Sequence, residues 1–154
     1  MITKTVGLTL ALCVSAVALG FAADPELGTW KLNEAKSKIA PSMPKNHTVV
    51  YEAAGDSVKI TVDGTDKDGK ATHNEWTGKF DGKDYPVTGD PNSDLRSYTK
   101  VDAHKLKFTV KQNGKSTTTG RAVISADGKS RAVTVSGTDA EGKKFKSVAV
   151  YDKQ

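Results

Sequence analysis

The sequence contains a single cysteine, Cys13, which lies inside an uncharged run near the N-terminus. An internal disulfide needs two cysteines, so no disulfide framework within the chain can hold the fold together. Stability must instead come from backbone pairing and from the burial of apolar side chains.

Large apolar side chains are also scarce. Aromatic residues make up 6% of the chain and the apolar set 36%, a share that the N-terminal run inflates. A core this thin suits a β-sheet with one solvated face better than a helical bundle. No segment with a helical period is long enough to supply a crossover between parallel strands, which argues against an α/β fold.

Basic residues are frequent but not clustered. The chain has 23 Lys and Arg against 18 Asp and Glu, a net charge of +5, and the two signs alternate along it. Nucleic-acid-binding surfaces usually need a clustered basic stripe, often with stacking aromatics. Lysines on the outer faces of strands, where they deter edge-to-edge pairing, explain this pattern better. We therefore expect no nucleic-acid partner.

The usual signatures of catalysis and zinc binding are missing as well. The sequence has neither a Gly-x-Ser-x-Gly nucleophile motif nor a Walker loop. His47, His73 and His104 fall in three separate segments, and a zinc site would need them to converge, perhaps with Glu75. We interpret these histidines as surface or turn residues, and we expect no metal, no cofactor and no catalytic residue.

One acidic segment is similar to the start of a calcium loop. Asp63, Asp66 and Asp68 precede Gly69, but an EF-hand would need a glutamate where Thr77 stands. An Asp-rich turn is the better interpretation.

The N-terminus has the pattern of a secretory signal. Met1 to Lys4 carry one positive charge, and residues 5–23 then form an uncharged run that ends in small residues before Asp24-Pro25. We predict a signal peptide over residues 1–22 and a mature domain over residues 23–154, located in the periplasm or outside the cell. The alternative is an uncleaved anchor, since the run is barely long enough to span a bilayer. After cleavage no stable membrane span is expected.

The rest of the chain alternates between strand and turn patterns. Residues 58–62 and 105–111 alternate apolar and polar side chains, which is the period of a strand with one buried face. Gly-containing turns recur at short intervals and accept the positive φ of hairpins. They centre on Gly55, Gly69, Gly82, Gly114, Gly128 and Gly142. This predicts an all-β, antiparallel, up-and-down meander of about eight to ten strands that closes into a barrel.

Two segments and one repeat stand out from this rhythm. Residues 33–45 contain two prolines and are expected to hold a short helix after an Asn33 cap, and residues 84–94 are expected to form a long mouth loop. Residues 62–70 match residues 135–143 at six of nine positions. We interpret the repeat as two hairpins with the same turn chemistry.

The start of the mature chain, Gly28-Thr29-Trp30, resembles the first strand of lipocalins and fatty-acid-binding proteins, the calycin group. The mature chain as a whole looks like the lipocalin-like proteins that many bacteria export. The resemblance implies a barrel whose Trp30 plugs one end and packs against an arginine from a late strand. The last strand has no arginine, so Arg121 or Arg131 would have to serve.

Arg121 and Arg131 are also the candidate ligand-binding residues. A two-residue turn at Asn113-Gly114 places Arg121 opposite Leu106, and a three-residue loop at 126–128 places it opposite Val133. Both arginines would then face inward with an apolar lining, and inward guanidinium groups favour an anionic headgroup. A three-residue loop at 112–114 would instead turn Arg121 outward. The predicted lining is Leu106, Phe108, Val133 and Val135.

These observations favour an exported protein that binds a small hydrophobic or anionic ligand. The first alternative is a non-catalytic envelope module whose barrel is filled by side chains, and an enzyme of unknown type comes third. The sequence leaves the oligomeric state and the ligand open.

Overall fold

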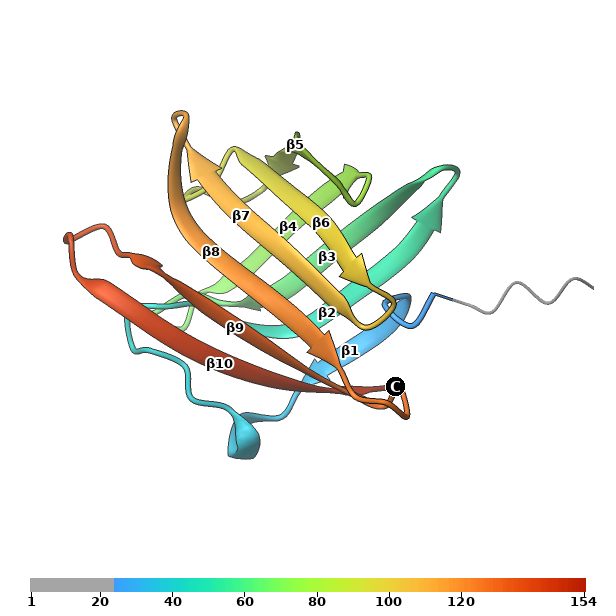
Figure 1. The fold of residues 1–154 in the computed structure, drawn as a ribbon. Coiled ribbons are helices and arrows are strands. Elements are labelled where there is room, and N and C mark those ends of the chain that lie inside the picture. The colour runs from blue at the N-terminus through green and yellow to red at the C-terminus, as the bar shows by residue number, and fades with distance from the viewer. Residues whose placement is uncertain (1–23) are drawn as a thin grey trace, which may run out of the picture.

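The structure is a computed structural model that describes residues 24–154. The predicted signal peptide, residues 1–22, lies outside the described residues, and its cleavage stays a prediction. The described chain forms ten strands and one 3-10 helix (Figure 1). The elements are β1 (Gly28–Leu32), η1 (Glu34–Lys36), β2 (Lys45–Ala54), β3 (Ser57–Thr65), β4 (Ala71–Gly78), β5 (Asp81–Thr88), β6 (Leu95–Asp102), β7 (Lys105–Gln112), β8 (Lys115–Ile124), β9 (Ser130–Thr138) and β10 (Lys144–Lys153).

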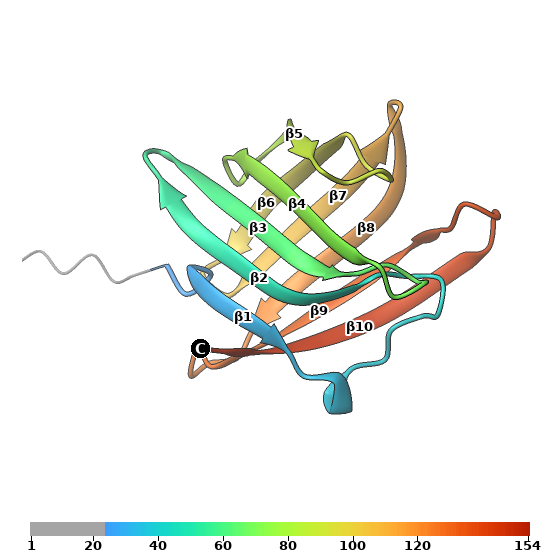
Figure 2. The same cartoon turned by 180° about the vertical axis from the view of Figure 1, so that it is seen from behind.

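The strands form a closed antiparallel barrel in which neighbours in space are neighbours in sequence. The one exception closes the barrel: β1 pairs with β10 on one side and with β2 on the other. Figures 1 and 2 show β1 beside β10 from both directions. The predicted all-β meander barrel is confirmed. Among the described residues, no helix combines the length and the apolar character that a membrane crossing requires.

Five of the six predicted hairpin turns are confirmed, whereas Gly82 lies at the start of β5 and not in the connection after β4. All six predicted turn glycines have a positive φ. At the β7–β8 turn, Asn113 has φ 51° and Gly114 has φ 77°, and Gln112 pairs directly with Lys115. Two consecutive residues of positive φ are the mark of a type I′ turn, whose twist matches that of the flanking strands.

The two irregular segments are shorter than predicted. The helix after Asn33 is the three-residue η1, and the Asn33 side chain accepts a hydrogen bond from the backbone N–H of Lys36 at 3.2 Å. The predicted loop over residues 84–94 was too long, because β5 extends to Thr88 and includes Pro86. The connection between β5 and β6 is residues 89–94.

Because the strands run alternately up and down, the connections gather at two ends of the barrel. The closed end carries residues 24–27 and the turns after β2, β4, β6 and β8, together with the C-terminus (Figure 2). The mouth carries residues 33–44 and the connections after β3, β5, β7 and β9. Most of the fully buried side chains lie toward the closed end or in the middle of the barrel, among them Trp30, Ile60, Trp76 and Leu106.

The sequence repeat corresponds to two hairpins at the mouth that share their turn chemistry. The side chain of Asp66 accepts hydrogen bonds from backbone N–H groups two and four residues later, and Asp139 does the same. The repeat also has a packing reason. A Cβ at Gly64 would lie 2.1 Å from the carbonyl oxygen of Lys45, and one at Gly137 would lie 2.1 Å from that of Thr117. In both places the preceding strand bulges toward the glycine.

Candidate ligand-binding site

The structure places Arg121 on the outer surface of the barrel, where it is exposed and lies opposite Lys107. The predicted pairing of Arg121 with Leu106 and Val133 is therefore wrong. The two-residue turn at Asn113-Gly114 is as predicted, but β8 has a bulge at Thr117 that shifts every later pair by one residue. A one-residue shift turns a strand's side chains to the opposite face.

Arg131 does face inward, because the next connection also differs from the prediction by one residue. Ser125 pairs with Ser130, which leaves four residues, 126–129, in the loop between them, so that Ile124 and not Val123 pairs with Arg131. The bulge in β8 and the extra loop residue each shift the pairing by one residue, so together they leave the side chains of β9 on the predicted faces. Leu106 is fully buried, and Phe108 and Val133 pack against the core. Their predicted role in ligand binding stays a prediction.

Arg131 is enclosed by aromatic rings at the closed end. Its guanidinium carbon lies 4.8 Å from the ring centroids of Trp30 and Tyr51 and 5.0 Å from that of Tyr151. Trp30 is 0% exposed and Arg131 is 2% exposed. The calycin resemblance implied that Trp30 plugs one end against a late-strand arginine, and Arg131 is that arginine. Burial raises the pKa of the Tyr151 hydroxyl to about 12 and also raises that of Tyr51.

Among the described residues, Glu26 is the only one whose carboxylate lies against Arg131. Its Oε2 lies 4.0 Å from Nη1 of Arg131, and neither carboxylate oxygen has a hydrogen-bond partner. Desolvation raises the pKa of Glu26 to about 7, although the charge of Arg131 opposes the shift. The indole N–H of Trp30 donates to the carbonyl oxygen of Glu26 at 3.0 Å. Residues 24–27 thus seal this end, and the cluster is a plug rather than an entrance.

The mouth half of the barrel is less completely packed. Val110 lies on the same inner face of β7 as Phe108, and Val135 on the same inner face of β9 as Val133. Val110 and Val135 do not pack against the core, and all four side chains are only partly buried. These residues lie on strands with neighbours on both sides. Solvent therefore reaches the inner face of β7 and β9 at this half of the barrel, and an apolar ligand group could cover it.

A second inward arginine, Arg96 on β6, lies at the border between the packed and open halves. Arg96 is two residues from Tyr98, so both side chains lie on the inner face of β6. Arg96 pairs with Val110 on β7. Its side chain is 10% exposed, and its Nε is buried without a hydrogen-bond partner. Its Nη2 makes only long contacts, at 3.5 Å to the Asn74 amide oxygen and 3.5 Å to the Asp90 carboxylate.

An aromatic cluster holds this part of the barrel in place. The indole N–H of Trp76 donates to the carbonyl oxygen of Arg96 at 2.9 Å, and the Trp76 ring packs edge-on against Tyr98 with centroids 4.7 Å apart. Tyr98 in turn lies 5.6 Å from Phe108. The backbone that carries Arg96 is therefore fixed, while its guanidinium keeps a donor without a partner. Such a preorganised, partly desolvated donor is suited to bind an anion or a carbonyl oxygen.

Sequence reasoning missed Arg96, although a signal was present. Period two along β6 places residue 96 on the same face as residue 98, and an aromatic residue at 98 favours the inward face. Pro86 and Pro91, which favour a loop over residues 84–94, hide the strand pattern that precedes β6.

The histidines do not converge on a metal site. Nδ1 of His73 forms a hydrogen bond with Oδ1 of Asp63 at 2.6 Å, and this bond raises the pKa of His73. His47 instead bonds to Thr65 at 3.1 Å. Within residues 24–154, no group of three or more His, Cys, Asp or Glu side chains could hold a metal ion.

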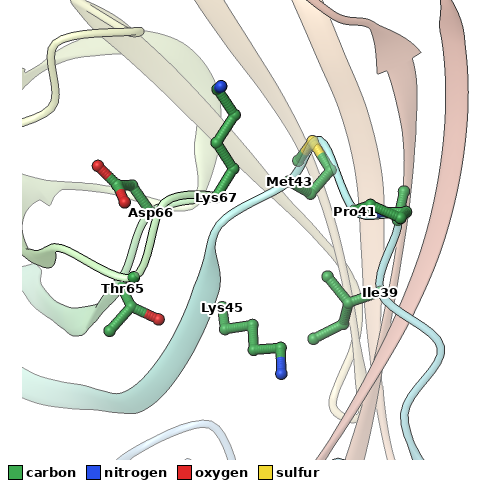
Figure 3. A pocket seen from close by; sticks show the side chains of 9 residues that line it. Ile39, Pro41, Met43, Lys45, Thr65, Asp66 and Lys67 are labelled. Atoms are coloured by element: carbon green, nitrogen blue, oxygen red, sulfur yellow. The ribbon is translucent and has the colours of Figure 1, made fainter.

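A small hollow lies at the rim of the mouth, between residues 39–45 and the β3–β4 turn (Figure 3). Its volume is about 240 Å³, and Ile39, Pro41 and Met43 line one side of it. Ligand pockets for small molecules usually measure about 300–1,000 Å³. The hollow is therefore small for a complete ligand, and we do not assign the site to it.

No protein-family model matches the chain, and no curated protein matches it. Among solved structures, the chain is similar to the one titled "Structure of EF1p2_mFAP2b bound to DFHBI". The sequence identity is 13% and the TM-score 0.48, over 86% of this chain and 97% of that chain. A similarity of this size does not bear on a ligand of the present chain.

Proposed function

We propose that the protein binds a small, partly apolar molecule with an anionic headgroup in the mouth half of its barrel. The single observation that supports this is Arg96, a buried inward arginine whose Nε has no partner. Burying a polar donor without a partner costs free energy. A headgroup that accepts a hydrogen bond from Arg96 would recover that cost.

The apolar part of the ligand would lie against the partly buried inner face described above. Val110 and Phe108 are on the strand next to Arg96, so a molecule held by its headgroup can reach them without crossing the barrel. Covering this face would stabilise the complex by about 25 cal/mol per Å² of apolar surface removed from water.

The main rival is a structural module whose barrel is filled by its own side chains. The closed half fits that description, because Trp30, Leu106 and Ile124 are buried there. The mouth half favours binding, since Val110 and Val135 face inward and are still partly exposed. Titration with a ligand distinguishes a binding protein from a structural module with a filled barrel.

Replacing Arg96 by glutamine is expected to weaken binding of a fluorescent fatty-acid analogue by roughly ten- to hundredfold. This is the factor that corresponds to a hydrogen bond with a charged group, about 1.5–3 kcal/mol. The measurement is a fluorescence titration of wild type, Arg96→Gln and Arg121→Gln. Arg121 is the matched control, because it is the same residue type on the outer face.

Arg121→Gln should bind like wild type. Equal affinity of Arg96→Gln and wild type, or no binding by wild type, would contradict the proposed site and favour the filled-barrel alternative. Thermal unfolding of both variants should show that each is folded.

We further propose that the protein acts in the periplasm or outside the cell. The supporting pattern is the uncharged run over residues 5–23. Export is expected to remove roughly the first 22 residues, and N-terminal sequencing of the exported protein measures this. A mature protein that still begins at Met1 would rule out cleavage.

A further inference from the structure

The carboxylate closest to Arg96 belongs to Asp90, in the connection between β5 and β6. Its Oδ2 lies 3.5 Å from Nη2 of Arg96, and its side chain is 21% exposed, so water screens the pair only in part. Asp90 thus places a negative charge beside the Arg96 guanidinium, whose free Nε the proposed function assigns to the ligand's headgroup.

The Asp90 carboxylate is bound more tightly to its own turn than to Arg96. Its Oδ2 accepts a hydrogen bond from the Ser93 hydroxyl at 2.6 Å, and its Oδ1 accepts one from the backbone N–H of Asn92 at 2.9 Å. The 3.5 Å contact with Arg96 is the longest of the three. Arg96 can therefore turn toward a ligand while Asp90 keeps its place in the turn.

The turn itself is fixed at both ends. A Cβ at Gly89 would lie 2.4 Å from the carbonyl oxygen of His73, so this end packs closely against β4. At the other end, the backbone N–H of Asp94 donates to the carbonyl oxygen of Lys111 at 3.0 Å. Ser93 is 5% exposed. The charge of Asp90 is consequently held near Arg96 and cannot move far when a ligand enters.

We infer that Asp90 is a built-in competitor that sets the charge selectivity of the Arg96 site. This rests on the proposed function, because it concerns the same headgroup. An anionic headgroup at Arg96 meets the repulsion of the Asp90 carboxylate, whereas a neutral acceptor such as an ester carbonyl does not. Asp90 therefore lowers the affinity of the site for carboxylates. It thereby reduces the difference in affinity between an acid and its neutral analogue.

The test compares one fluorescent fatty acid with its methyl ester on wild type, Asp90→Asn and Asp94→Asn. Asparagine keeps the oxygen that accepts from the backbone N–H of Asn92, and its amide nitrogen replaces the oxygen that accepts from Ser93 and can donate to that hydroxyl instead, so the turn is preserved. A partly exposed ion pair is worth about 1 kcal/mol, which corresponds to roughly a fivefold change in affinity. Asp90→Asn is expected to bind the acid about fivefold more tightly and the ester as wild type does.

Asp94→Asn is the matched control. It removes the same charge from the same connection, but the Asp94 side chain accepts from the backbone N–H of Asn113 and has no ion pair with Arg96 among the described residues. It should change the affinity for neither ligand. An equal gain in Asp94→Asn would assign the effect to net charge and overturn the inference.

Two further outcomes separate the inference from the proposed function. If the acid binds in an Arg96-dependent manner and Asp90→Asn binds it no more tightly, Asp90 is not a competitor and the proposed function stands. If neither acid nor ester binds to wild type or to Asp90→Asn, the proposed function fails and the inference fails with it. Binding of the acid by Asp90→Asn but not by wild type would support the inference, because Asp90 would then exclude the acid from Arg96, and would contradict the proposed function of the native protein.

Discussion

Replacing Trp30 by alanine is expected to lower the free energy of unfolding by about 3–5 kcal/mol, the cost of deleting a fully buried large aromatic side chain. Trp30 is 0% exposed, and its ring covers the Arg131 guanidinium at 4.8 Å. Its removal would leave a cavity and would also expose one face of a buried charge. Both effects destabilise the folded state.

Urea denaturation followed by far-ultraviolet circular dichroism measures this effect without relying on tryptophan fluorescence. Val101→Ala is a suitable control, because Val101 is 50% exposed and its truncation should cost less than about 0.5 kcal/mol. Trp30→Phe keeps most of the ring but loses the hydrogen bond to the Glu26 carbonyl, and an intermediate loss is expected. A change under about 1 kcal/mol in Trp30→Ala would show that the plug carries little of the stability.

The second large effect is a loss of stability as the pH rises from about 4.5 to about 7. The pKa of Glu26 is raised from 4.5 to about 7 in the folded state, so in this range the folded protein holds a proton that the unfolded chain releases. Stability rises with pH only where the unfolded state binds more protons, so here it must fall. At 1.36 kcal/mol per unit of pKa shift, the loss is on the order of 3 kcal/mol.

Glu26→Gln should remove most of this slope, because glutamine stays neutral at every pH. Unfolding free energies of both proteins, measured from pH 4 to pH 8, give the difference curve. His73 also makes stability fall as the pH rises, since its hydrogen bond to Asp63 raises its pKa in the folded state. This contribution is present in both proteins and cancels in the difference curve. The same slope in wild type and Glu26→Gln would mean that Glu26 is ionised in the fold with little cost.

The fold was largely predictable because it depends on local signals. Strands such as β3 and β7 show period two, and most hairpins have a glycine where the backbone needs a positive φ, as at Asn113-Gly114. Closure was predicted because a long antiparallel meander removes its exposed edges best by closing into a barrel. The Trp30 and Arg131 contact followed from the resemblance, which required a late-strand arginine without saying which one.

The site was less predictable because side-chain direction depends on single-residue shifts. The bulge at Thr117 has no strong sequence signal of its own, and it turned Arg121 outward. A second one-residue difference in the β8–β9 loop restored Arg131 to the interior, so that prediction was correct only because two errors cancelled. Gly137, whose absent Cβ makes room for the Thr117 carbonyl, was the available clue to the bulge.

The pairing of β1 with β10 has a consequence for the order in which the protein folds. Every other strand pair joins consecutive strands, whereas this pair brings together residues such as Asn33 and Asp152, which are 119 positions apart. The chain entropy of so long a loop must be lost before the few pairs between these strands form, which makes closure a late and slow event. The hairpins can therefore assemble as an open, curled sheet, and the enclosure of Arg131 by Trp30 and Glu26 completes the molecule last. A chain interrupted before its final strand would keep that arginine in water.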